Sequence, residues 1–160
     1  MTPKIKSYQN LVALVDALLD SEGDLIANLA NVSALLFEHI DKLNWVGFYL
    51  KKGDDLVLGP FQGKVACSRI PLYKGVCGKA MQDQQVINVP NVLDFPGHIV
   101  CDHASRSEIV IPMVVNGHAI GVLDVDAPIF ARFDDVDAQY LSEIVDLIIK
   151  KLPDAFNQEA

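Results

Sequence analysis

The first forty residues carry hydrophobic side chains at the three- and four-residue spacing of amphipathic helices. One helix is predicted over residues 7–19, with an apolar face formed by Tyr8, Leu11, Val12, Val15, Leu18 and Leu19. The acidic, glycine-containing segment 20–24 ends this helix, and Asp24 can cap the next one. That second helix is predicted over residues 25–39, with core positions at Leu25, Leu29, Val32, Leu35, Leu36 and the adjoining Ile40.

After residue 43 the pattern changes to short apolar and aromatic runs bounded by turn residues, which is typical of β-strands. Strands are predicted over residues 44–50, 56–61 and 65–70, with a hairpin turn around Gly53 between the first two. A short helix that ends near Gln84 comes next, followed by a strand over residues 86–89 and a loop over residues 91–97.

Two longer apolar runs, residues 109–115 and 119–125, flank Asn116-Gly117. Both residues of this pair tolerate positive φ, so the pair predicts a type I′ hairpin turn. A closing helix is predicted over residues 133–151, with Asp134 as its N-cap. Helices at both ends and hairpin strands between them indicate an α+β fold, in which a central antiparallel sheet of about six strands is flanked by the N- and C-terminal helices.

The composition predicts one globular domain over residues 1–160, because 51% of the residues are hydrophobic and only 21% are charged. The formal net charge of −8 disfavours nucleic acid and anionic membranes as partners, since phosphate binding needs clustered Lys and Arg. No apolar run approaches the roughly 18 residues of a membrane span, and the N-terminus lacks the apolar core of a signal peptide. A soluble, cytoplasmic protein is therefore expected.

The chain has three cysteines, Cys67, Cys77 and Cys101, which cannot all pair within it. An odd set of this kind indicates redox or nucleophilic chemistry, or buried thiols. Cys101 lies in the polar stretch 98–108, directly after the Pro96-Gly97 break, so we expect it on a loop. A thiol in a polar, partly exposed setting is a candidate nucleophile.

The other two cysteines have weaker signals of their own. Cys67 falls in an apolar predicted strand, where a cysteine is most often a small core residue. Cys77 lies beside Gly75 and Gly78, which allow the backbone to move and could let this thiol join a redox exchange.

Asp124 and Asp126 lie two apart on a predicted strand, so both side chains point to one face of the sheet. That face is either exposed to solvent or the floor of a pocket. In a pocket, one carboxylate can hold an ammonium group, and another that stays protonated through crowding can donate a proton. Trp45 and Tyr49 also share a face of their strand, where they either pack in the core or wall an apolar slot.

Several segments together resemble one known family, the free methionine-R-sulfoxide reductases, which are single-domain enzymes with a GAF fold. The matching segments are NWVGFY at residues 44–49, LGPFQG at 58–63, GVCG at 75–78, GHIVCD at 97–102, SEIVIP at 107–112 and GVLDVD at 121–126. All three cysteines fall in or next to these motifs. The resemblance implies reduction of free L-methionine-(R)-S-oxide to L-methionine, which repairs oxidative damage to the amino acid.

The resemblance also implies roles for particular residues. Cys101 is the expected nucleophile, which passes through a sulfenic acid, and Cys67 is the expected resolving thiol of an intramolecular disulfide, with Cys77 able to take over or relay. The residues expected to bind or activate the substrate are Glu108, Asp124, Asp126, Trp45 and Tyr49. A thioredoxin-like dithiol is the expected reductant, no cofactor is needed, and a homodimer is possible.

Two details of an amino-acid site follow from these assignments. The acidic residues near Cys101 are expected to raise the pKa of its thiol until the substrate ammonium offsets their charge. The substrate α-carboxylate needs a partner, and Arg106 or, better, the backbone N–H groups of the loop before Cys101 could supply it.

Two rival functions use the same residues. A non-catalytic GAF sensor would bind a cyclic nucleotide or a pigment in the pocket, although Cys101-Asp102-His103 lacks the adjacent Cys-His at which pigments attach. A metal site could combine Cys101, His103 and either His98 or another cysteine, but the cysteines lack the short spacing of structural zinc sites, so no metal is expected.

Overall fold

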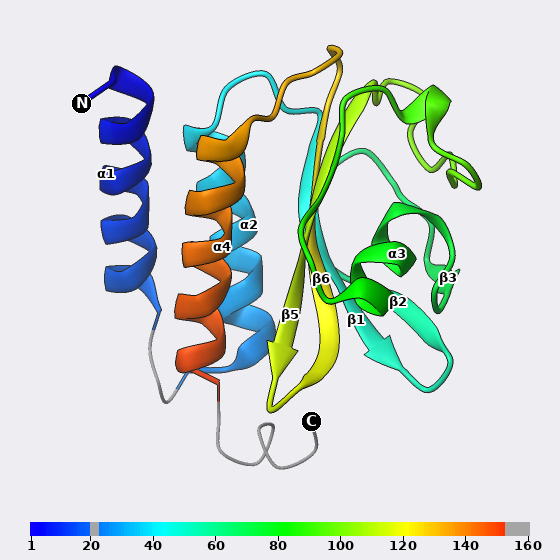
Figure 1. The fold of residues 1–160 in the computed structure, drawn as a ribbon. Coiled ribbons are helices and arrows are strands. Elements are labelled where there is room, and N and C mark those ends of the chain that lie inside the picture. Colours follow the sequence, from blue (N-terminus) through cyan, green and yellow to red (C-terminus); the bar gives the residue numbers. More distant parts are fainter. Residues whose placement is uncertain (20–22, 153–160) are drawn as a thin grey trace.

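In the computed structural model, which describes residues 1–19 and 23–152, helices cover both faces of one sheet (Figure 1). The helices are α1 (Pro3–Leu18), α2 (Leu25–His39), α3 (Gly75–Asp83) and α4 (Asp135–Lys150), with a 3-10 turn η1 (Val92–Asp94). The strands are β1 (Trp45–Lys52), β2 (Asp55–Gly63), β3 (Arg69–Pro71), β4 (Ile87–Val89), β5 (Ser107–Val115) and β6 (His118–Ala127). Described helices and strands thus follow the predicted order, and the α+β fold is confirmed.

Local side-chain caps fix the N-termini of three of the described helices, α1, α2 and α4. The carboxylate of Asp24 accepts a hydrogen bond from Ala27 N at the start of α2, and Asp134 forms a capping box with Asp137 at the start of α4. α1 begins at Pro3 rather than at residue 7, because the Thr2 hydroxyl caps it and proline suits the first helical turn. The segment predicted to end α1 lies partly outside the described residues.

In the described part of the chain, six antiparallel strands form the sheet, in the order β3-β2-β1-β6-β5-β4. The β5–β6 hairpin turns at Asn116-Gly117, where φ is 52° and 80°, as the turn prediction requires. The third predicted strand is the main error: residues 65–68 lie outside any strand, and β3 covers only Arg69–Pro71. Val65 is 87% exposed, so this apolar run does not pack in the core.

The central strands are buried on both faces. α2 and α4 lie against one face, with α1 outside them, and α3 covers part of the other (Figure 1). Along β1, Val46 and Phe48 point toward α2 and α4, whereas Trp45 and Tyr49 point toward α3. A polar side chain on the α3 face of the central strands is therefore enclosed by the protein.

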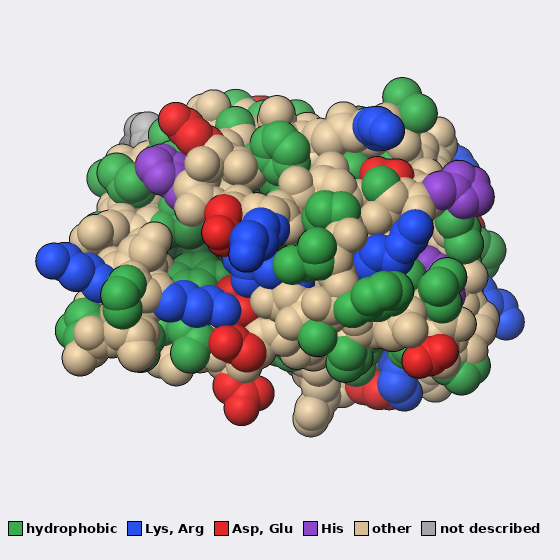
Figure 2. Space-filling model, turned by 90° about the horizontal axis from the view of Figure 1, so that it is seen from above, with side chains coloured by type: hydrophobic (Ala, Val, Ile, Leu, Met, Phe, Trp, Pro, Cys, Tyr) green, Lys and Arg blue, Asp and Glu red, His purple; other side chains and the backbone are tan. Residues whose placement is uncertain are grey.

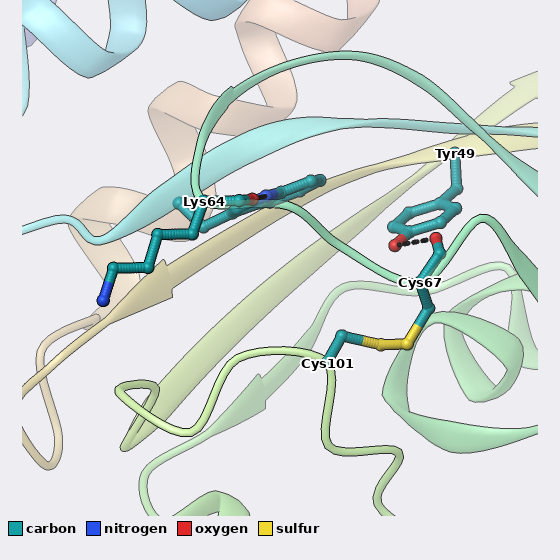
Figure 3. Close-up of a disulfide and its surroundings, with 5 residues drawn as sticks. Tyr49, Lys64, Cys67 and Cys101 are labelled. Carbon is teal, nitrogen blue, oxygen red and sulfur yellow. Dashed lines mark hydrogen bonds between the residues drawn. A yellow bond between two sulfur atoms is a disulfide. The ribbon is translucent and has the colours of Figure 1, made fainter.

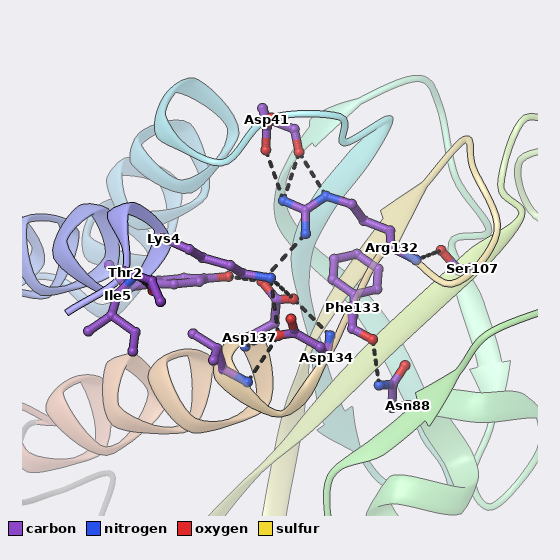
Figure 4. Close-up of polar contacts among 12 residues, drawn as sticks. Thr2, Lys4, Ile5, Asp41, Asn88, Ser107, Arg132, Phe133, Asp134 and Asp137 are labelled. Carbon is purple, nitrogen blue, oxygen red and sulfur yellow. Dashed lines mark hydrogen bonds and ion pairs between the residues drawn. The ribbon is translucent and has the colours of Figure 1, made fainter.

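A buried polar network joins the outer helix to the rest of the fold (Figure 4). The carboxylate of Asp137 on α4 is fully buried, and it accepts a hydrogen bond from the Tyr8 hydroxyl. Lys4 Nζ lies 2.7 Å from Asp137 Oδ2, and the Arg132 guanidinium lies 3.5 Å from Asp137 Oδ1. Arg132 also binds Asp41, which follows α2, so one buried carboxylate links α1, α4 and the chain entering β1.

The end of the molecule at the top of Figure 1 carries basic side chains mixed with acidic ones rather than gathered into one patch (Figure 2). Among the described residues, no helix is long and apolar enough to cross a membrane. That residues 1–160 form a single domain stays a prediction.

Candidate active site

Three strands bring the predicted substrate-binding residues together on the α3 face of the sheet. Glu108 on β5 lies opposite Asp126 on β6, and Asp126 in turn lies opposite Trp45 on β1. Asp124 lies two residues before Asp126 and Tyr49 four residues after Trp45, so the alternation of side chains places them on the same face. All five residues line one cavity.

The acidic face is buried, so the interpretation of it as a solvent-exposed face is wrong. Glu108 and Asp124 are each only 6% exposed, because α3 and the loops beside it cover this part of the sheet. Among the described residues no lysine or arginine forms an ion pair with Glu108, Asp124 or Asp126. Three carboxyl groups therefore share one enclosed space and, in the described part of the chain, have no Lys or Arg partner in an ion pair.

Burial sets the protonation of this cluster. It raises the pKa of Glu108 and Asp126 well above the usual range, and the charge of Asp124 raises both further. Burial also raises the pKa of Asp124, but hydrogen bonds from Glu108, Asp126 and Cys77 to its carboxylate act in the lowering direction. Asp124 is consequently the member that most readily carries the negative charge.

Cys77 lies in α3, directly over the acidic face, and is buried. Burial raises the pKa of its thiol well above the ordinary value, and Asp124 and Glu108 raise it further. Gly78 serves packing here, because a Cβ at this position would approach the backbone of Tyr73 to 2.4 Å. The thiol next to the carboxylates is thus held neutral within a packed helix.

Cys67 and Cys101 are joined in a disulfide at the edge of the cavity, with their Cα atoms 5.4 Å apart (Figure 3). Cys67 is therefore not a free thiol of the core, although it packs, half-buried, against the cluster on the α3 face. Its segment leaves the sheet after β2 and runs beside the loop that carries Cys101, where both cysteines are only partly buried. The two cysteines are 34 residues apart in the sequence, and the tertiary fold brings them together.

The two aromatic residues of β1 line the cavity and also hold the Cys67 segment. The Tyr49 hydroxyl donates a hydrogen bond to the carbonyl oxygen of Cys67 at 2.9 Å (Figure 3). Trp45 Nε1 donates to the carbonyl oxygen of Lys64 at 3.2 Å, and the two rings stack with centroids 5.9 Å apart. Trp45 and Tyr49 therefore combine core packing with a place in the cavity wall.

Asn44 is a positioning residue that sequence reasoning missed. Its Nδ2 donates hydrogen bonds of 3.0 Å to Asp102 Oδ2 and to Ser105 Oγ, which fasten the Cys101 loop to the start of β1. Its place as the first residue of the predicted strand 44–50 and of the NWVGFY segment is the only sequence signal. Arg106, by contrast, donates to the carbonyl oxygens of His103 and Ser105.

The cavity between these residues has a volume of about 40 Å³, which holds an ion or a few water molecules. Lys74 and Gly75 at the start of α3 also line it, as do Cys101 and His98. Burial lowers the pKa of His98, against the opposing effect of Asp124.

The metal-ligand set suggested by the sequence does not form as such, because Cys101 is in the disulfide. A different set, Cys77, Glu108 and Asp124, has ligand atoms within 4.8 Å of one another.

Comparison with known proteins identifies a consistent set of relatives. The sequence profile of the GAF domain matches residues 11–152. The chain is 50% identical over 149 residues to the free methionine-R-sulfoxide reductase of Escherichia coli, covering 93% of this chain and 90% of that protein. It is 40% identical over 155 residues to the free methionine-R-sulfoxide reductase of Saccharomyces cerevisiae, covering 92% and 86%.

A solved structure agrees with these sequence matches. The free methionine-R-sulfoxide reductase of Neisseria meningitidis, determined in complex with its substrate, superposes with a TM-score of 0.92 at 41% identity. The superposition covers all of this chain and 96% of that one. The GAF fold expected from the sequence is therefore confirmed.

Proposed function

Because this chain belongs to the GAF-domain free methionine-R-sulfoxide reductases, we propose that it reduces free L-methionine-(R)-S-oxide to L-methionine through Cys101 and Cys67. The observation that carries the proposal is the Cys67–Cys101 disulfide beside a buried acidic pocket. A disulfide at that place is the oxidised product that a thiol-dependent sulfoxide reductase must leave behind.

The reaction takes two electrons from each pair of thiols. The Cys101 thiolate attacks the sulfoxide sulfur, the sulfoxide oxygen is protonated and passes to the cysteine, and methionine leaves, so that Cys101 becomes a sulfenic acid. The Cys67 thiolate then attacks the Cys101 sulfur and forms the disulfide, with release of water. A thioredoxin-like dithiol restores both thiols and is itself oxidised to a disulfide.

The three carboxyl groups divide the remaining work by their protonation. Asp124, the member most readily ionised, binds the substrate ammonium by a charge-assisted hydrogen bond. Glu108, held protonated by burial, donates a proton to the sulfoxide oxygen. Asp126, also held protonated, donates to Asp124 and keeps its charge in place.

The other parts of the substrate meet the remaining walls of the cavity. Trp45 and Tyr49 face the methyl and thioether groups. The N-cap Lys74 and the first residues of α3, Gly75 and Val76, line the cavity, and no described side chain caps this end of the helix. The positive end of the helix dipole therefore suits the substrate α-carboxylate better than Arg106 does.

Three further expectations accompany this function: a cytoplasmic location, a thioredoxin-like partner and assembly as a homodimer. Sedimentation of the purified protein tests the dimer. Comparison of purified thioredoxin with glutathione as electron donors tests the partner.

The decisive experiment measures consumption of free L-methionine-R-sulfoxide with dithiothreitol, with the S epimer as control. We expect turnover of the R epimer alone, and its loss in Cys101→Ser. Cys77→Ser serves as the matched cysteine substitution and should retain the Cys67–Cys101 disulfide. If the wild-type protein is inactive on both epimers, the enzymatic proposal fails, and the pocket should be searched for a bound ligand instead.

A further inference from the structure

Cys77 and two buried carboxyl groups of the pocket form a compact set of metal-ligand atoms. The Sγ atom of Cys77, an oxygen of Glu108 and an oxygen of Asp124 lie within 4.8 Å of one another, and all three residues are buried. They come from three different elements, α3, β5 and β6, so the tertiary fold brings them together.

A second observation is that one carboxylate oxygen of this set is left without a hydrogen bond. Asp124 Oδ1 and Asp126 Oδ1 are buried and, among the described residues, neither oxygen has a hydrogen-bond partner. Asp124 is only 6% exposed, so solvent reaches it poorly. A buried carboxylate oxygen without a hydrogen bond or a cation is costly, and a bound cation would satisfy it.

We propose that Cys77, Glu108 and Asp124 form a binding site for Zn²⁺ or a similar divalent ion such as Cd²⁺. Zinc accepts thiolate sulfur and carboxylate oxygen together, whereas Mg²⁺ and Ca²⁺ prefer oxygen alone. Ligand atoms around a tetrahedral zinc ion lie about 3.5 Å apart, so this set needs only small side-chain rotations. The fourth position remains for water or for His98, which lines the same cavity.

An ion at this position has a consequence for the enzyme, which rests on the proposed function. It would occupy the carboxylate assigned to the substrate ammonium, so metal and substrate exclude each other. Binding involves no redox step: the Cys77 thiol and the Glu108 carboxyl group lose their protons to solvent, and their sulfur and oxygen atoms coordinate the ion. Zinc-like metals are therefore inhibitors of this protein rather than resident cofactors.

The disulfide form offers a clean test, because Cys77 is then the free thiol of the three cysteines. The full-length oxidised protein is titrated with Cd²⁺, and the ultraviolet charge-transfer absorption of a cadmium–thiolate bond is recorded. We expect one equivalent to produce the band, no band in Cys77→Ser, and at least tenfold weaker binding in Glu108→Gln. Glu38→Gln, the same change at an exposed residue, should bind as the wild type does.

Absence of the band in the wild-type protein overturns the site, as does a band that persists in Cys77→Ser. Retention of the Cys67–Cys101 disulfide shows that Cys77→Ser has folded, and Glu108→Gln tests the site without touching a thiol. These readouts do not depend on catalysis, so they stand even if the protein proves inactive on methionine sulfoxide.

Mutual exclusion is tested in single turnovers of reduced, reductant-free protein with and without Zn²⁺. We expect zinc to slow methionine formation in the wild type. In Cys77→Ser, about tenfold more zinc should be needed to slow methionine formation by the same fraction of that variant's metal-free rate. Equal sensitivity of both proteins would place the metal on the Cys67–Cys101 thiols and overturn the proposed inhibition.

Discussion

The hydroxyl group of Tyr49 donates a hydrogen bond to the carbonyl oxygen of Cys67 at 2.9 Å, from a strand at the centre of the sheet to a segment outside it. This contact fixes the backbone of one disulfide partner relative to the floor of the pocket (Figure 3). It also buries the phenol, and burial together with Asp124 raises the pKa of Tyr49, so the hydroxyl stays a donor.

Tyr49→Phe removes this hydrogen bond and keeps the aromatic wall. A typical bond of this kind stabilises by about 1 kcal/mol, so we expect disulfide formation after a single turnover to slow several-fold, with methionine formation changed less. Rapid quenching with a thiol-alkylating reagent and mass spectrometry measures both steps. Tyr73→Phe, the same change at an exposed tyrosine, is the control, and an unchanged disulfide rate in Tyr49→Phe would contradict the prediction.

The pairing of Cys67 with Cys101 predicts which thiol resolves the intermediate. In a single turnover without reductant, Cys67→Ser should accumulate a Cys101 sulfenic acid, whereas Cys77→Ser should form the disulfide. Trapping with dimedone and locating the adduct by mass spectrometry distinguish the two. A disulfide between Cys77 and Cys101 in Cys67→Ser would show that Cys77 can relay after all.

The buried acid cluster predicts an unusual pH dependence of stability. The folded-state pKa of Glu108 is raised well above its value in the unfolded chain, so its contribution to stability is full below about pH 4.3 and is lost as pH rises through the folded pKa. The amide of Glu108→Gln does not ionise, so the variant does not lose this stability as pH rises. The free energy of unfolding of the variant, relative to wild type, should therefore increase by about 1–3 kcal/mol between about pH 4 and about pH 8.

Urea unfolding in the presence of EDTA measures this difference without interference from metal ions. Glu38→Gln is the control, because this glutamate is exposed. A gap between wild type and Glu108→Gln that does not change with pH would mean that Glu108 is ionised in the folded protein.

The network around Asp137 predicts a stability effect remote from the pocket. Tyr8→Phe removes a hydrogen bond to a fully buried carboxylate, and bonds to charged groups contribute about 1.5–3 kcal/mol (Figure 4). We expect Tyr8→Phe to lower the free energy of unfolding by about 1.5–3 kcal/mol. Single-turnover methionine formation should be unchanged. Tyr140→Phe is the matched control, since its ring stacks on Tyr8 and no hydrogen bond to its hydroxyl is found among the described residues. Equal losses in the two variants would assign the effect to ring packing.

Much of this protein could be predicted from its sequence because the decisive signals are local. The helices follow from apolar spacing and from caps such as Asp24 and Asp134, and the β5–β6 hairpin follows from Asn116-Gly117. The shared face of Asp124 and Asp126 follows from the two-residue period of a strand. The family resemblance supplied the candidate chemistry on top of these patterns.

The tertiary structure alone decided what surrounds those groups. It showed that α3 covers the acidic face, that the Cys67 segment lies outside the sheet beside the Cys101 loop, and that Cys77 is the thiol beside Asp124. Each of these contacts joins segments far apart in the chain, and each depends on how whole elements pack. Periodicity predicts which way a side chain points, but burial and neighbours arise only when helices and strands assemble, and those neighbours set the protonation on which the proposed chemistry depends.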